Sequence, residues 1–94
     1  MRFLWDEGKS RRNYAKHKVS FETAQLVFED PCAISRLDRV TEAEERWHTL
    51  GLVHGIIVLL VAHTYCEQEG EEVIRIISAR KATSHERNIY EQGR

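Results

Sequence analysis

Two arginines on one predicted strand are the residues of this chain best suited to chemistry on an anion. Four of the five residues from Val73 to Ile77 are β-branched, which favours a strand running from Glu72 to Arg80. Arg75 and Arg80 lie on this strand, where an arginine is costly to hold unless something anionic meets it. Because the planar guanidinium matches the oxygens of a phosphate, the end of the strand is a candidate phosphate site.

Arg80 is the first candidate, because a helix N-terminus is expected directly after it. Thr83 and Glu86 have the spacing of a capping box, so a helix should begin near Ser84. The free N–H groups at such an end favour phosphate, and an arginine beside them would stabilise negative charge that develops at a reacting phosphorus. The alternative is structural, since Arg80 can form a salt bridge with Glu86 or with Glu45.

Arg75 is the second candidate on the same strand. Residues five apart on a regular strand point to opposite faces, so Arg75 and Arg80 are expected to be separated unless a bulge intervenes. The two are then not expected to bind the same phosphate, and Arg75 can instead contact a protein partner or pair with an acid. The sequence leaves open whether the two arginines share one site.

Proton transfer needs another residue type, and His63 is the candidate for it. It lies near the end of an apolar run predicted as a strand, Ile56–Tyr65, and imidazole changes its charge close to neutral pH. A histidine in such a place is more often a hydrogen-bonded structural group, so both roles are retained. Which residue acts as general base and which as general acid cannot be read from the sequence.

Four further residues are candidates for binding a nucleic acid. Lys16 and His17 end a predicted basic helix, where they can hold phosphates or simply stabilise the helix C-terminus. Arg46 lies in a predicted hairpin and can form an ion pair or a contact to the nucleic acid. Tyr90, on the last predicted helix, can stack on an exposed base.

The charges are unevenly distributed, although the formal net charge is only -1. Residues 1–20 carry six cations and two acids, residues 21–74 three cations and eleven acids, and residues 75–94 five cations and two acids. If the two basic ends meet in space, they form a patch that attracts nucleic acid or an acidic protein. The alternative is an ordinary solvated helix face.

Length and composition exclude several classes of protein. The 94 residues are expected to form one domain with a single modest core. The longest apolar run, Ile56–Ala62, is far shorter than the ~20 residues of a membrane span. The N-terminus lacks the apolar core of a signal peptide, so we expect a cytoplasmic protein without membrane contact. Neither Cys32 and Cys66 nor the acidic residues have a spacing that requires a metal, and no metal or other cofactor is expected.

Caps, periodicity and turn residues indicate the elements that must position these side chains. In the first half of the chain we expect a strand at Phe3–Trp5, a helix capped by Asp6 and ending near His17, and a second helix capped by Ser20 and ended by Asp30-Pro31. A strand at Cys32–Leu37, a loop at Asp38–Ala43, and a hairpin of Arg46–Leu52 and Ile56–Tyr65 that turns near His54-Gly55 are expected next. The chain should end with a turn at Glu67–Gly70, the strand Glu72–Arg80, and a helix over Ser84–Gln92 with Gly93 as its stop. This order predicts an α+β fold. Its antiparallel sheet can pack helices on one face and leave the other partly open, and an open face lined with arginines would suit RNA.

These residues also belong to a wider pattern that covers nearly the whole chain. Its blocks are Trp5-Asp6, Lys9, Asn13, Lys16-His17, Val19-Ser20-Phe21, Phe28-x-Asp30-Pro31, Glu45-Arg46-Trp47, Gly51, Val61-x-His63-Thr64, and Ile74-Arg75-Ile76-Ile77-Ser78-Ala79-Arg80-x-Ala82-Thr83-x-x-Glu86-Arg87-x-x-Tyr90. In this pattern the chain resembles the BrnT toxins, which belong to the wider RelE-like group of small bacterial ribonuclease toxins. The last block is the most specific part of the match. One departure is Lys18, where the family usually has a glycine that favours a left-handed helix end.

The resemblance implies a RelE-like α+β fold with a central antiparallel sheet, two N-terminal helices and one C-terminal helix. It implies a type II toxin that acts as a metal-independent endoribonuclease, cleaves RNA by 2′-hydroxyl attack without a cofactor, and inhibits translation and growth. It also implies neutralisation by a BrnA-like antitoxin in a hetero-oligomer, with operator DNA bound only through the antitoxin. The catalytic candidates are then Arg80, Arg75 and His63, and the RNA-binding candidates are Lys16, His17, Arg46 and Tyr90.

Two other functions compete with this interpretation. A non-enzymatic module could bind RNA or a protein partner and use its arginines to position the ligand without chemistry. A DNA-binding repressor acting alone is disfavoured, because no helix-turn-helix or ribbon pattern has a basic reading face and an acidic body separates the basic segments. Cleavage preference, ribosome dependence, the antitoxin footprint and the stoichiometry of the complex cannot be read from one sequence.

Overall fold

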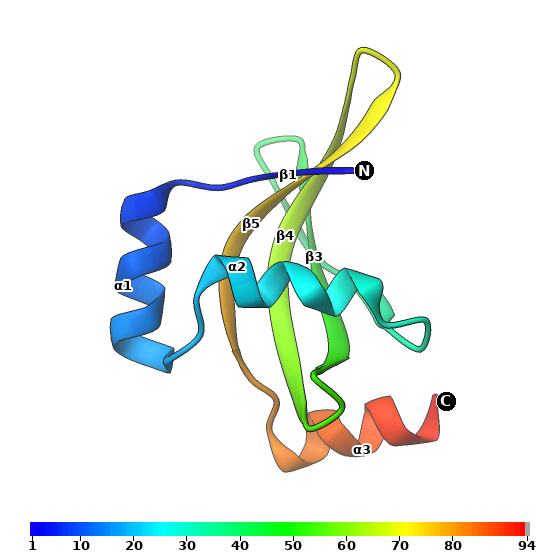
Figure 1. Ribbon diagram of the computed structural model, residues 1–94. Helices are drawn as coiled ribbons and strands as arrows, with labels where there is room; N and C mark the ends of the chain where they lie inside the picture. The colour runs from blue at the N-terminus through cyan, green and yellow to red at the C-terminus, as the bar shows by residue number, and fades with distance from the viewer. Residues whose placement is uncertain (94) are drawn as a thin grey trace.

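Five strands and three α-helices make up the structure, a computed structural model that describes residues 1–93 (Figure 1). In chain order they are β1 (Arg2–Leu4), α1 (Glu7–His17), α2 (Phe21–Ala24), the 3-10 helix η1 (Gln25–Glu29), β2 (Ile34–Thr41), β3 (Glu44–Val53), β4 (Ile57–Gln68), β5 (Glu71–Lys81) and α3 (Ser84–Gln92). The strands form one sheet with the order β1-β5-β4-β3-β2. The predicted α+β class is therefore confirmed.

The sheet is mixed rather than fully antiparallel, which corrects one expectation. Strands β2 to β5 pair antiparallel with their chain neighbours, but β1 lies parallel to β5, with Phe3 opposite Ile74. The ring of Phe3 packs against Phe28, so a tertiary contact supports β1 at the sheet edge. A strand of three residues carries no periodicity that would reveal its partner.

The hairpin of β2 and β3 continues through residues 38–41, so the expected loop at Asp38–Ala43 is wrong. Its turn consists only of Glu42 and Ala43, whose φ angles are 50° and 63°. Two-residue hairpin turns with positive φ usually contain Asn, Asp or Gly. Because this turn has none of them, the sequence carried no signal for it. The turn predicted at His54-Gly55 does have positive φ at both residues and is confirmed.

The starts of the helices follow from capping residues, as predicted. The Asp6 side chain accepts the N–H of the third residue after it and begins α1, and Ser20 begins α2 in the same way. Thr83 and Glu86 form a complete capping box at the start of α3. These caps act within one helical turn, which is why the sequence alone reveals them.

Lys18 ends α1 in the left-handed conformation that a glycine would favour. Its φ is 61° and its ψ is 28°, and its backbone N–H donates to the carbonyl of Tyr14 at 2.8 Å. The chain thus leaves the helix in the left-handed conformation that glycine favours, although residue 18 is a lysine.

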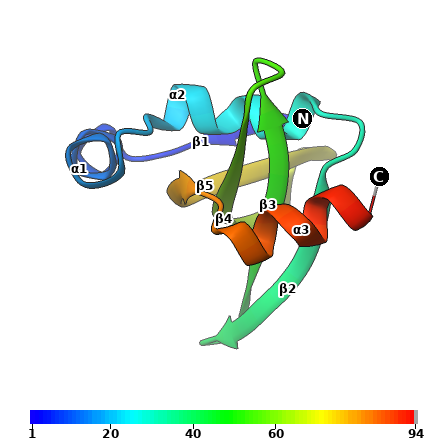
Figure 2. The ribbon, with the colours of Figure 1, turned by 90° about the horizontal axis from the view of Figure 1, so that it is seen from below.

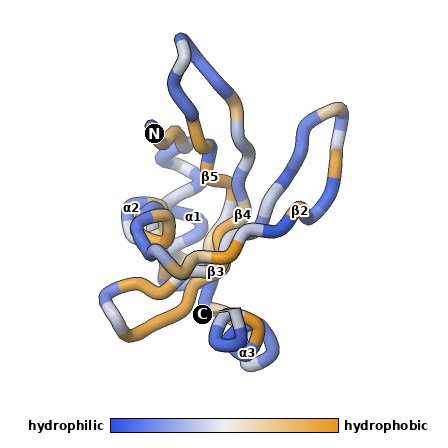
Figure 3. The backbone as a smooth tube through the Cα atoms, turned by 90° about the vertical axis from the view of Figure 1, so that its right-hand side faces the viewer, coloured by the Kyte–Doolittle hydropathy of each residue, from blue (hydrophilic) through white to orange (hydrophobic). Residues whose placement is uncertain are grey.

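Helices cover one face of the sheet and leave much of the other exposed. α2 and η1 pack on one face, here called the helix face; α1 lies beside β5 at the edge; and α3 crosses one end of the opposite face, here called the open face (Figures 1 and 2). The larger core lies under α2 and η1 and includes Phe21 and Val27, and the smaller core lies under α3 and includes Leu60 and Tyr90. The tips of the β2–β3 and β4–β5 hairpins extend beyond the helices and are largely hydrophilic (Figure 3).

Candidate functional site

A bulge in β5 brings Arg75 and Arg80 to the same face of the sheet. The pairing of β5 with β4 shifts at Ile77, which has no residue opposite it. Arg75 pairs with Thr64 and Arg80 with Leu60, two residues of β4 that share a face because they are four apart. The expectation of opposite faces assumed a regular strand, and the extra residue overturns it. The two Cα atoms remain separated by ~13 Å of strand, and each guanidinium is held by a different carboxylate, that of Arg75 by Glu44 and that of Arg80 by Glu86.

Arg80 is held by an acid of α3. Its Nη1 and Nη2 donate to the two carboxylate oxygens of Glu86 at 2.8 and 2.9 Å. The hydrogen bonds from Arg80 are the main reason that the pKa of Glu86 is lowered to about 2. Glu86 is therefore a carboxylate at neutral pH and a weak proton acceptor. The structural alternative for Arg80 is thus present, yet the Arg80 side chain keeps 37% of its surface exposed and can still face a ligand.

Arg75 and Arg46 form a second cationic group on the open face. Both pair with Thr64, from the two sides of β4, which sets their Cα atoms about 10 Å apart. Arg75 donates to Glu44 at 2.9 Å. Arg46, in contrast, forms no salt bridge within residues 1–93, and its Nε is buried without a hydrogen-bond partner there. The structure therefore groups Arg46 with Arg75 and not with Arg80.

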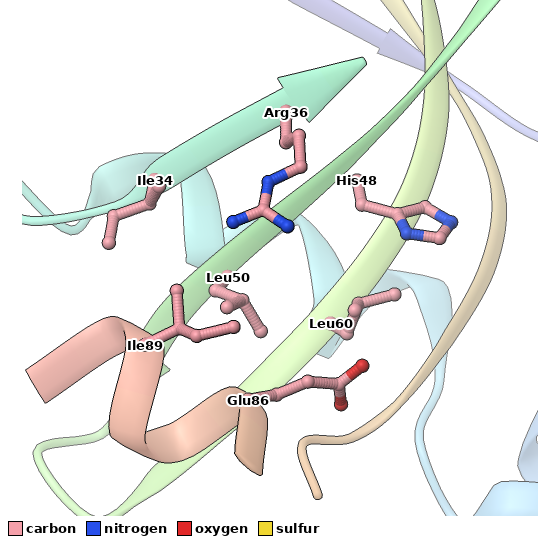
Figure 4. Close-up of a pocket in the computed structure, with 7 residues that line it drawn as sticks. All are labelled: Ile34, Arg36, His48, Leu50, Leu60, Glu86 and Ile89. Carbon is pink, nitrogen blue, oxygen red and sulfur yellow. The ribbon is translucent and has the colours of Figure 1, made fainter. Parts of the chain in front are cut away.

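A small hollow on the open face contains a histidine that the sequence interpretation missed. Arg36 and His48 line it from β2 and β3, and Glu86 lines it from α3 (Figure 4). The Nε2 of His48 lies 3.6 Å from a carboxylate oxygen of Asp38, and 36% of its side chain is exposed. The only signal for His48 in the sequence was its position two residues from Arg46, which places the two side chains on one face of a strand.

His63 lies on the helix face, away from all of these arginines. It is 0% exposed, its ring packs edge-on against Phe28 and Tyr65, and its Nε2 is 2.7 Å from the hydroxyl of Thr49. Burial, and to a lesser degree the charge of His48, lowers the pKa of His63 to about 4, so its ring is neutral at pH 7. His63 therefore has the environment of a hydrogen-bonded structural group, because a fully buried side chain on the helix face cannot reach the open face.

The remaining predicted binding residues lie in different environments. Tyr90 is 1% exposed and its hydroxyl donates to Asp30. No face of its ring is free to stack on a base, because the ring is part of the core under α3. Lys16 is exposed and His17 is half-buried at the end of α1, where both line a hollow between α1 and β5. Lys16 and His17 therefore remain candidates for binding RNA, whereas a buried Tyr90 cannot stack on a base.

The open face offers positive charge and the partly exposed imidazole of His48. Guanidinium groups stabilise developing negative charge, and an imidazole transfers protons near neutral pH. Within residues 1–93, no three His, Cys, Asp or Glu side chains gather closely enough to hold a metal ion. The helices described here are all too short or too polar to cross a bilayer.

Comparisons with known proteins place the chain in a family. The crystal structure of the Brucella abortus ribonuclease toxin BrnT is similar, with a TM-score of 0.63 and 23% sequence identity, over 89% of this chain and 99% of that chain. At this identity the likeness shows the fold alone. A search of curated proteins found no match. The family described as the ribonuclease toxin BrnT of type II toxin–antitoxin systems matches residues 5–86. This match spans most of the chain, and the protein therefore belongs to the BrnT family of ribonuclease toxins.

Proposed function

We propose that this protein is a metal-independent endoribonuclease that cleaves RNA on the open face of its sheet. The observation that carries the proposal is the family match over residues 5–86, which makes the chain a ribonuclease toxin. The arginines and the exposed histidine of the open face support the location. Cleavage would occur by attack of a ribose 2′-hydroxyl on the adjacent phosphorus, a reaction that needs charge stabilisation and proton transfer but no cofactor.

Arg80 is assigned to the reacting phosphate. Its partly exposed guanidinium lies at the end of β5, beside the N-terminus of α3, and these donors together would stabilise the charge of the phosphorane. Glu86 holds the guanidinium in one orientation, so an incoming phosphate meets a positioned group. Arg75 and Arg46 would bind a neighbouring phosphate of the same strand, because Arg75 is held by Glu44 and not by the acid that positions Arg80.

Proton transfer is assigned to His48 in place of His63. His48 is partly exposed on the open face, next to Arg36 in the hollow that Glu86 also lines. Its imidazole would take the proton of the 2′-hydroxyl as the oxygen attacks phosphorus. The bond to the 5′-oxygen then breaks, that oxygen takes up a proton, and the products carry a 2′,3′-cyclic phosphate and a 5′-hydroxyl.

The partner and the cellular effect belong to the same proposal. The matched family is part of type II systems, in which the toxin is paired with an antitoxin protein. We propose that a BrnA-like antitoxin neutralises this chain in a hetero-oligomer and that operator DNA is bound only through the antitoxin. Free toxin would act in the cytoplasm, where RNA cleavage inhibits translation and growth. The RelE-like relationship of the fold is proposed on the same basis.

Incubation of the purified chain with a structured RNA in EDTA tests the reaction. We expect cleavage that leaves 2′,3′-cyclic phosphate ends, and we expect Arg80→Ala to lower the cleavage rate by about 100-fold or more, as loss of a transition-state donor does. Arg11→Ala is the matched control, since Arg11 is exposed on the side of α1 that faces away from β5. His48→Gln should also lose activity, and His63→Gln should retain it.

Circular dichroism of each variant separates loss of chemistry from loss of fold. A folded Arg80→Ala protein with full activity would remove Arg80 from the site. RNA that stays intact but is retarded in a gel by the wild-type chain, with or without added ribosomes, would favour a non-enzymatic binding module. Cleavage that stops in EDTA and returns with a divalent cation would contradict metal independence.

A further inference from the structure

A groove between α1 and β5 has the length and charge of a nucleic-acid track. Two hollows meet in it, because both are lined by Lys9 and Ile77. The larger hollow, of about 570 Å³, extends to Arg46 and Arg75. The smaller hollow extends along α1 to His17. This combined space, here called the α1 groove, is continuous with the open face, since Arg46 and Arg75 belong to both.

The groove exists because β1 ends early. β1 covers the edge of β5 only as far as Arg75, and the edge from Ile76 onward faces α1 instead. Asn13 holds the helix at this edge, since its side-chain amide donates to the carbonyl of Ala79 at 2.8 Å and its carbonyl accepts the Ala79 N–H at 3.1 Å. The same amide also donates to the carbonyl of Val19 at 2.7 Å. The two hydrogen bonds to Ala79 hold α1 at a fixed distance from β5 in this structure, and the third ties it to the segment that follows the helix.

The helical cations of the groove form no salt bridges in the described residues, although Asp6, whose pKa is lowered mainly by the hydrogen bond from the Lys9 N–H, is also near enough to Lys9 and Arg12 for their charges to help lower it. Lys9, Arg12 and Lys16 are exposed along one side of α1, and none of them forms a salt bridge within residues 1–93. Asp6 is the one acidic residue among those that line the two hollows, and it is occupied as the N-cap of α1. Arg46 adds a guanidinium whose Nε is buried and unpartnered in the described residues.

The spacing of these cations suits a chain of phosphates. Lys9, Arg12 and Lys16 follow one another at about 4.5 and 6 Å along the helix axis, given the rise of an α-helix. Positively charged grooves that follow the backbone in this way bind single strands without reading their sequence. The open end of the groove leads to Arg75, which the proposed function places beside the reacting phosphate.

We infer that the α1 groove binds the sugar–phosphate backbone of single-stranded RNA next to the cleavage site. The inference rests on the proposed function for the identity of the strand. Lys9, Arg12 and Lys16 each contact a phosphate outside the site of chemistry, and Arg46 and Arg75 hold the strand where it passes onto the open face. Binding along the groove directs one strand to Arg80 and contributes affinity without taking part in the chemical step.

Fluorescence anisotropy with a short 2′-O-methyl RNA tests the groove, because that RNA binds but cannot be cleaved by 2′-hydroxyl attack. We compare the wild-type chain with the triple variant Lys9→Gln, Arg12→Gln, Lys16→Gln over a range of salt concentrations. Each lost phosphate contact should reduce the slope of log affinity against log salt by about 0.7, so the triple variant should lose about 2 and bind at least about tenfold more weakly at low salt. On cleavable RNA the triple variant should show a raised KM with little change in kcat.

Single variants of two adjacent arginines provide the matched control. Arg12 lines the groove and Arg11 lines the opposite side of α1, while both are exposed and carry the same charge. Arg12→Gln should reduce the salt slope and Arg11→Gln should leave it unchanged. If the triple variant binds as wild type, or if Arg11→Gln weakens binding as much as Arg12→Gln, the groove inference is wrong even though the chain still cleaves RNA. If groove-dependent binding persists but the wild type never cleaves RNA, the proposed function fails and the groove stands.

Discussion

The open face and the α1 groove both carry positive charge, but they hold it differently. On the open face Arg75 and Arg80 each donate to a carboxylate, while Arg46, where the face meets the groove, forms no salt bridge within residues 1–93. In the α1 groove Lys9, Arg12 and Lys16 form no salt bridge within the described chain. A paired guanidinium is fixed in direction and largely neutralised at a distance, whereas an unpaired cation keeps its long-range attraction for an anion. If RNA binds as we propose, the groove attracts the strand and the open face orients it.

The largest expected effect on stability comes from removing the side chain that holds α1 beside β5. Asn13→Ala removes three buried hydrogen bonds and leaves the backbone of Ala79 and Val19 without partners. We expect the free energy of unfolding to fall by about 3 kcal/mol, measured by urea denaturation. RNA affinity should fall with it, because α1 is no longer held beside β5.

Arg11→Ala is the control for the Asn13 experiment, since Arg11 is exposed on the same helix outside the groove and its loss should change stability by less than about 0.5 kcal/mol. If Asn13→Ala were as stable as wild type and bound RNA equally well, the groove would not depend on this anchor.

The second prediction asks whether only the open face takes part in chemistry. His63 has an ordinary pKa of 6.5 when unfolded and a pKa of about 4 when buried. Between these values the unfolded chain binds more protons, so stability should fall by about 2 kcal/mol as pH is lowered from 6.5 to 4. His63→Gln should flatten this dependence in urea titrations and retain RNA cleavage at pH 7. A folded His63→Gln protein that has lost cleavage would return His63 to the catalytic site.

The third prediction converts a paired arginine into an unpaired one. Glu86→Gln keeps the capping box, because glutamine can accept the same N–H of Thr83, but removes the charge that holds Arg80. The pKa of Glu86 is about 2 in the folded chain and 4.5 in the unfolded one, so its contribution is present above pH 4.5 and is lost as pH falls towards 2. We expect a loss of about 1 kcal/mol at pH 7, since solvent screens the exposed part of the pair, and no difference near pH 2.

RNA binding by Glu86→Gln would sharpen the comparison further. Freed from its carboxylate, Arg80 should add about 0.7 to the salt slope for the 2′-O-methyl RNA, as an unpaired cation of the groove does. An unchanged slope would mean that Arg80 does not meet a phosphate in the bound state.

The smallest effect is expected at the end of α1, outside the groove. Lys18 has a φ of 61°, which strains a residue with a side chain. Lys18→Gly should relieve that strain and raise the free energy of unfolding by about 0.5 kcal/mol, because the greater freedom of glycine in the unfolded chain offsets part of the gain. Thermal unfolding should show a slightly higher Tm and RNA affinity should stay the same. A clear loss of RNA affinity would mean that the binding surface of the α1 groove continues beyond His17.

Local signals in the sequence were sufficient for some elements and insufficient for others. The caps at Asp6 and Thr83 predicted the starts of α1 and α3, because a cap and its helix lie within one turn of chain. The turn at Glu42-Ala43 was missed because neither residue is of a type that usually adopts positive φ. Tyr90 was misjudged because an aromatic residue reads the same in sequence whether it packs in a core or faces RNA.

By itself the sequence determined the α+β class, the helix starts and the family pattern, and it led to the hypothesis that arginine is the chemical residue. Only the tertiary structure decided which arginines share a face of the sheet, through one unpaired residue in β5 that turns Arg75 and Arg80 to the same side. It also decided that His63 is fully buried and His48 is only partly buried. The reason is physical: propensity and capping are local, whereas the phase of a strand and the burial of a side chain depend on pairing and packing between residues far apart in the chain.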